Sequence, residues 1–180
     1  MLNSLRTRAE TRRKAGEIYG AVVTQARSEH FYAALGVPDT PTGRYEMVTL
    51  HLVLVLERLR QLGDTSALPR LLAETFVVDM DDSLRELATG DLTVPKKIRR
   101  VAAGLYDRTM TYRAALATPD DRTLTESLLA HVYDGAPTAD ASRLARYVRR
   151  SAASLAGVDV EALTRGGGFP QPSDPAGDAL

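Results

Sequence analysis

The chain has 180 residues, of which 44% are hydrophobic and 26% charged, the composition of an ordinary soluble globular domain. Its 23 basic residues balance its 23 acidic ones, so no overall field attracts it to nucleic acid, and we expect no DNA partner. The absence of cysteine excludes disulfides, thiolate catalysis and cysteine-ligated metal centres.

Membrane and targeting signals are weak in this sequence. No run of apolar residues is long enough to span a bilayer. The basic opening residues, MLNSLRTRAETRRKAG, lack the apolar centre of a secretory signal. Arginine outnumbers lysine by twenty to three, as is common in GC-rich bacterial genes. We therefore expect a bacterial protein of the cytoplasm.

Helical periodicity begins after a basic N-terminal segment, residues 1–14. Apolar residues spaced at i, i+3 and i+4 from Ala15 to Ala26 predict the first helix. A short second helix is expected after Ser28, and Gly36 ends it before a loop that is rich in turn residues.

Residues 44–62 predict the central helix of the fold. Apolar side chains occupy nearly every face of this segment, as in a helix that is surrounded by other helices. His51 lies inside it, and no HxxxH or HxxE companion accompanies it. We therefore expect a buried, hydrogen-bonded histidine rather than a metal or haem ligand.

Two helices of opposite charge are predicted next. One runs from near Ser66 to Gly90, and Pro95 opens the other. Outside their buried stripes the first helix carries carboxylates and the second carries cations, namely Asp79, Asp81, Asp82, Lys96, Lys97, Arg99 and Arg100.

Two further helices complete the predicted helical domain, residues 15–164. Thr118 and Pro119 predict the start of one, and Thr138 is expected to cap the last long helix, whose outer face carries four arginines. Residues 165–180 are so rich in glycine and proline that we expect a disordered tail. The pattern as a whole predicts an all-α, single-domain bundle of about six to seven helices.

The charged surfaces are compatible with more than one function. The carboxylates could serve a metalloenzyme, but they lack the alternating ligands and central glycine of a calcium loop. We expect an acidic surface facing solvent or a partner, with no metal and no other cofactor. The basic helices could contact phosphates, so a small ribosome- or RNA-binding module is the alternative. The sequence contains no phosphate-binding glycine loop and no nucleophile elbow.

Three stretches resemble the ubiquinol–cytochrome c chaperone family, the assembly factors for cytochrome b in mitochondria and alphaproteobacteria. They are IYGAVVTQAR with FYAALGVPDT, then GRYEMVTLHLVLVLERL, and finally FVVDMDD with GDLTVPKKIRRVAAGLYDR. Each stretch alone is an ordinary helix. Their order and spacing make the resemblance specific, and it covers roughly residues 15–150.

The resemblance implies an all-helical, non-enzymatic assembly chaperone. Such proteins bind newly made cytochrome b near the ribosomal exit tunnel, together with a small partner subunit, and support assembly of the ubiquinol–cytochrome c reductase. For this chain it implies nascent cytochrome b as the partner, with the ribosome and a partner subunit as further expectations. The basic face could also approach anionic lipid, so a peripheral contact with the inner face of the cytoplasmic membrane is expected as well. The candidate contact positions are Asp79, Asp81, Asp82, Lys96, Lys97, Arg99, Arg100, Tyr106 and Arg108.

Overall fold

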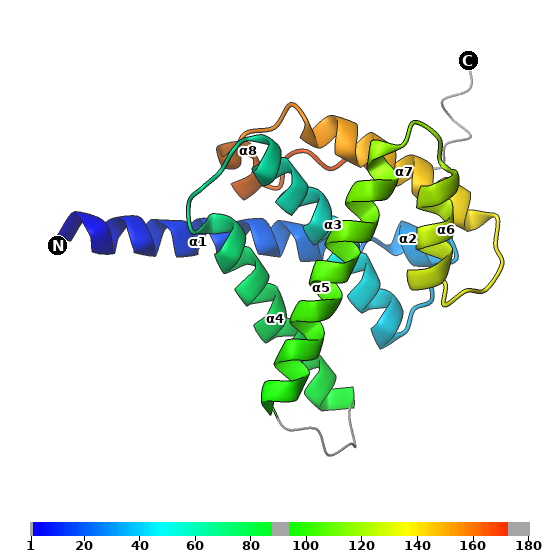
Figure 1. The fold of residues 1–180 in the computed structure, drawn as a ribbon, viewed down its shortest axis with the longest axis horizontal. Coiled ribbons are helices and arrows are strands. Elements are labelled where there is room, and N and C mark those ends of the chain that lie inside the picture. The colour runs from blue at the N-terminus through cyan, green and yellow to red at the C-terminus, as the bar shows by residue number, and fades with distance from the viewer. Residues whose placement is uncertain (1, 88–93, 173–180) are drawn as a thin grey trace.

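The computed structural model describes the chain at residues 2–87 and 94–172, and its side chains at 6–80 and 99–172. Within these ranges the chain forms six long helices and two five-residue helices, with no strand (Figure 1). The predicted all-α fold is confirmed. The helices are α1 (Leu2–Ala26), α2 (Glu29–Ala33), α3 (Pro41–Gln61), α4 (Leu68–Leu87), α5 (Val94–Ala117), α6 (Arg122–His131), α7 (Asp140–Leu155) and α8 (Val160–Thr164).

The central helix is α3, as the sequence predicts. Every residue from Met47 to Val55 is buried, because α1, α4, α5 and α7 all pack against this helix. Its start is set by local chemistry. Pro41 occupies the first turn, and the Thr40 hydroxyl accepts a hydrogen bond from the Gly43 amide at 3.1 Å. A side chain at Gly43 would collide with the Pro38 carbonyl, so only glycine fits there.

The other long helices surround α3. Helix α1 packs against α3 and α4, and its N-terminal end extends beyond the rest of the molecule (Figure 1). Helix α5 packs on α3 and α4 and contacts α6, which in turn pairs with α7. The short helix α8 closes on α1, where Lys14 forms an ion pair with Glu161 at 2.5 Å.

His51 confirms the expectation of a buried, hydrogen-bonded histidine. Its side chain is fully buried, with Nδ1 2.7 Å from the Met47 carbonyl oxygen and Nε2 2.9 Å from the Tyr147 hydroxyl. Because a carbonyl only accepts, Nδ1 carries the proton and Nε2 accepts from Tyr147. Burial lowers the pKa of His51 to about 4, so the ring is neutral in the folded protein.

Residues 165–172, the C-terminal strap, differ from the predicted disordered tail. Phe169 packs against the core, with its ring centroid 5.2 Å from that of His51, and the Pro170 carbonyl accepts a hydrogen bond from Gln25. The glycines that suggested disorder provide the turn instead, because Gly166 and Gly168 have positive φ angles. The rest of the predicted tail, 173–180, lies outside the described residues.

The predicted start of α6 at Thr118 is also wrong. The helix begins only at Arg122, because the preceding turn is held by a long-range contact from α7. Arg149 donates to the Thr118 carbonyl at 2.8 Å, to the Asp120 carbonyl and to the Asp121 carboxylate. Arginines that the sequence places on an outer face of α7 thus include one that joins α7 to the α5–α6 turn.

Candidate functional site

The solvent-facing side of α5 carries an apolar stripe that the fold does not cover. Five residues spaced three and four apart share this face, and all of them are exposed. The two large ones are also among the most exposed apolar side chains of the described chain, Tyr106 at 69% and Met110 at 47%. We call these residues the outer stripe: Ala103, Tyr106, Met110, Ala114 and Ala117.

The opposite face of α5 holds the helix in place. Val101, Leu105, Tyr112 and Ala115 are buried there among the residues of the core. Because these positions also recur at helical spacing, their burial fixes the rotation of α5 about its axis and keeps the outer stripe in solvent.

Two ion pairs between α5 and α3 also fix the orientation of α5. Arg108 binds the buried carboxylate of Glu46, with Nη2 2.8 Å from Oε1. Arg113 binds Glu57 through Nε at 2.7 Å, and Glu57 also pairs with Arg60. The arginines around Glu57 lower the pKa of its carboxyl group. Both pairs join the same two helices, so they resist rotation of α5 as well as its separation from α3.

Arg99 and Arg100, at the N-terminal end of α5, are exposed as the sequence predicts. In helical register Arg99 continues the outer stripe by one turn beyond Ala103. Asp107 flanks the stripe farther along, and its carboxylate accepts from Arg108 Nη1 at 3.0 Å. The face of α5 is therefore apolar along its length and cationic at one end.

Two of the predicted contact positions make intramolecular bonds instead of facing solvent freely. Asp79 is half-buried and accepts a 2.7 Å hydrogen bond from the Tyr19 hydroxyl, which joins α4 to α1. Burial, together with this carboxylate, raises the pKa of Tyr19. Arg108 is committed to Glu46. Both residues hold helices together, and the sequence alone does not reveal their partners.

The remaining predicted positions divide into two groups. Tyr106 lies in the middle of the outer stripe, with Arg99 and Arg100 at its end. Four others lie on α4 or α5, but their side chains are outside the described residues: Asp81, Asp82, Lys96 and Lys97. Sequence reasoning missed Met110, although its position four residues after Tyr106, outside the buried stripe, is a usable signal.

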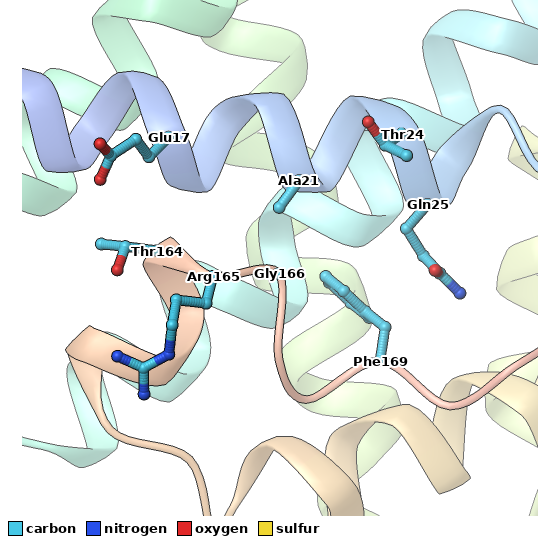
Figure 2. Close-up of a pocket in the computed structure, with 8 residues that line it drawn as sticks. All are labelled: Glu17, Ala21, Thr24, Gln25, Thr164, Arg165, Gly166 and Phe169. Atoms are coloured by element: carbon cyan, nitrogen blue, oxygen red, sulfur yellow. The ribbon is translucent and has the colours of Figure 1, made fainter.

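A hollow of about 380 Å³ lies between α1 and the C-terminal strap (Figure 2). Two of its polar side chains already have partners within the protein, since Gln25 donates to the Tyr147 hydroxyl and Glu17 pairs with Arg13. We therefore regard this hollow as the seam where the strap meets α1. It is lined by Glu17, Ala21, Thr24, Gln25, Thr164, Arg165, Gly166 and Phe169.

Among the described residues there is neither a cluster of metal-binding side chains nor a membrane-spanning helix. Among the described side chains, at 6–80 and 99–172, no three His, Asp or Glu gather in a way that could hold a metal ion. None of the helices in 2–87 and 94–172 combines the length and the apolar character needed to cross a membrane.

Comparison with known proteins assigns the family. The family model described as "Ubiquinol-cytochrome C chaperone" matches residues 33–169. Among solved structures the chain is similar to the Cbp3 homolog from Brucella abortus, with a TM-score of 0.82 and 34% sequence identity over 96% of this chain and 98% of that one. No curated protein matches. Sequence and fold thus agree, and the chain belongs to the ubiquinol–cytochrome c chaperone family.

Proposed function

We propose that this protein supports assembly of the ubiquinol–cytochrome c reductase by binding newly synthesised cytochrome b through the outer stripe of α5. Family membership over residues 33–169 supports the assembly role. The observation that carries the choice of surface is the exposure of Tyr106 and Met110 on a rigidly held helix. No catalytic step is part of the proposal.

The chemistry of the stripe suits an apolar helical client. A contiguous exposed apolar face is typical of a surface that binds a partner. Met110 is flexible and can adapt to different client side chains, whereas Tyr106 combines an apolar ring with a polar tip. The alanines on either side allow a client backbone to approach closely. Residues spaced three and four apart match the spacing of a helix laid against them.

Charged residues at the ends of the site are proposed to orient the client. Arg99 and Arg100 would bind acidic residues that flank an apolar client segment. Asp81 and Asp82 stay predicted contacts for basic client loops. The ribosome and a small partner subunit also stay predictions from the family resemblance.

Site-specific photocrosslinking during synthesis of cytochrome b tests the proposal. Photoreactive residues would replace Tyr106 and Met110 on the stripe, with Glu126 of α6 and Ala153 of α7 as exposed control positions. We expect crosslinks to cytochrome b from the two stripe positions, none from the controls, and none when an unrelated membrane protein is synthesised.

The possible outcomes distinguish a wrong binding surface from a wrong function. Crosslinks to cytochrome b from the control positions alone would show that the protein binds cytochrome b, but through a surface other than the outer stripe. If the wild-type chain captures no cytochrome b but binds RNA with a steep dependence on salt, the RNA-binding alternative replaces the proposal.

A further inference from the structure

The N-terminal end of α1 is a basic helical arm. It extends beyond the packed helices (Figure 1), and the side chains of residues 6–10, 12 and 13 are exposed. Within residues 6–14 there are five cationic side chains and one carboxylate, in a chain whose overall charge is zero. The chain thus concentrates positive charge on its most prominent projection.

Most of this charge is not neutralised within the protein. Arg13 pairs with Glu17, and Lys14 pairs with Glu10 and Glu161. By contrast, no carboxylate among the described side chains lies within ion-pair distance of Arg6, Arg8 or Arg12, the three arm arginines. The arm therefore presents three arginines that are available to an external anion.

The arrangement around the helix indicates what kind of anion. At 100° per residue, positions 2, 5 and 9 (Leu2, Leu5 and Ala9) share one face of α1. Arg6 falls on one side of this face, and Arg8 and Arg12 on the other. Thr7 and Thr11 lie opposite, where the Thr11 hydroxyl donates to the Thr7 carbonyl. An apolar face bordered by arginines is typical of a helix that lies on an anionic membrane surface.

The body of the protein leaves this face accessible. In the same register Gly16 and Gly20 continue it along α1, and a Cβ at either glycine would meet no other atom within 4 Å. Glycine is less favourable than alanine inside a helix, and no packing contact at these two positions requires a glycine. The bare backbone face turns away from the buried residues of α1, such as Ile18 and Val22. Headgroups could therefore reach the helix without a clash.

We propose that the arm of α1 docks the protein on a bilayer rich in anionic lipid. The apolar face is small, so most of the attraction is electrostatic, and binding should require anionic headgroups and weaken with salt. The inference does not depend on the proposed binding of cytochrome b. It assigns a peripheral membrane contact to α1, whereas the sequence suggests the basic residues at the start of α5 for such a contact.

Vesicle flotation of the full chain tests the proposal. We would compare vesicles of phosphatidylcholine alone with vesicles containing 30% phosphatidylglycerol, at low and high salt. The triple variant R6Q/R8Q/R12Q removes the three arm arginines and keeps good helix formers. The control R70Q/R122Q/R146Q removes the same charge from exposed positions elsewhere.

We expect the wild-type chain to bind only the anionic vesicles. At roughly fivefold per arginine, the arm variant should bind on the order of 100-fold more weakly, and the control should stay close to wild type. An R6K/R8K/R12K variant should retain binding. Leu5→Ser should weaken binding to vesicles and leave any binding to poly(U) RNA unchanged.

Three results would overturn the proposal. The first is equal loss of vesicle binding in the arm variant and the control, which would show a non-specific charge effect. The second is no binding to anionic vesicles together with RNA binding that depends on the arm. The third is no vesicle binding together with a dimer that Gly16→Leu abolishes, which would mean that the bare face of α1 packs against a second copy.

Discussion

Arg108 of α5 holds Glu46 of α3 with two donors, Nε at 3.1 Å from Oε2 and Nη2 at 2.8 Å from Oε1. Only 5% of the Glu46 side chain and 19% of the Arg108 side chain are exposed. The hydrogen bonds that Arg108 donates to Glu46 raise the pKa of Arg108, so the guanidinium stays charged. The fork geometry fixes α5 on α3 and thereby fixes the direction in which the outer stripe faces.

Arg108→Ala should destabilise the fold by about 3 kcal/mol, because it leaves the Glu46 carboxylate buried without a counter-ion. Arg44→Ala is the matched control, since Arg44 and Asp39 form a similar pair with 58% and 59% of their side chains exposed. It should cost far less, because solvent screens an exposed pair. Urea unfolding measures both, and equal effects would show that the Glu46–Arg108 pair is no more important than a surface pair.

Arg149→Lys should also destabilise the fold, although the charge is conserved. A lysine cannot reach the Thr118 carbonyl and the Asp121 carboxylate in the same planar geometry as the guanidinium. We expect a loss of about 1–3 kcal/mol from carbonyls left without donors. Arg146→Lys, at an exposed position on the same helix, should be neutral. Equal unfolding curves for the two variants would show that the guanidinium of Arg149 does not stabilise the α5–α6 turn.

Phe169→Ala should loosen the C-terminal strap. The ring lies against His51 and is only partly buried, so we expect a loss of about 1–2 kcal/mol rather than the larger cost of a fully buried phenylalanine. Hydrogen exchange should speed up at residues 165–172 more than in α3. The control Val78→Ala, at a side chain that is 63% exposed, should change neither. A strap that exchanges fast already in the wild type would restore the predicted disorder.

His51 should make the fold less stable in mild acid. Its pKa is lowered from 6.5 to about 4, so between these values the unfolded chain binds a proton that the folded chain does not. The free energy of unfolding therefore falls as pH falls below 6.5, by about 2.5 kcal/mol from this residue between pH 7 and 4.5. Well above pH 6.5, where the ring is neutral in both states, its contribution is constant.

His51→Gln tests this pH dependence. Glutamine can donate to the Met47 carbonyl and accept from Tyr147 but does not titrate. Urea unfolding at pH 7 and 4.5 should show a smaller drop in the variant than in the wild type. Carboxylates and His131 titrate in both proteins, so their effect cancels in the comparison. An identical drop would mean that His51 does not resist protonation in the fold.

The sequence was sufficient for the central helix and for the buried face of α5, because the apolar spacing of each is local. The run around His51 predicts α3 as the central helix, and the stripe through Val101 and Leu105 predicts the buried face of α5. The family resemblance was likewise visible in the order of the helical stretches. In each case the information lies within a single helix or in the order of the helices.

The differences arise where a residue's partner is far away in sequence. In the sequence Arg108 has the appearance of a surface cation, and only the packing of α5 on α3 reveals its partner Glu46. Arg149 likewise holds a turn through Asp121, which lies 28 residues earlier in the chain. The glycines of the strap look like a linker until Phe169 finds a place beside His51. Such contacts cannot be predicted from composition or from the spacing of apolar residues. Tyr106 was predictable as exposed because its position follows from the helical register alone.

Replacing the outer stripe should leave the fold intact. Tyr106→Ser with Met110→Ser removes two side chains that are 69% and 47% exposed and lie outside the core, so the free energy of unfolding should stay within about 0.5 kcal/mol of the wild type for each. Urea unfolding and circular dichroism measure this, and Tyr112→Ser, which opens a cavity on the buried face of the same helix, should be strongly destabilised by comparison. If the stripe variant unfolds as readily as Tyr112→Ser, the two side chains support the core, and any loss of client binding would reflect unfolding. If it stays folded, a loss of crosslinking to cytochrome b measures the binding surface itself.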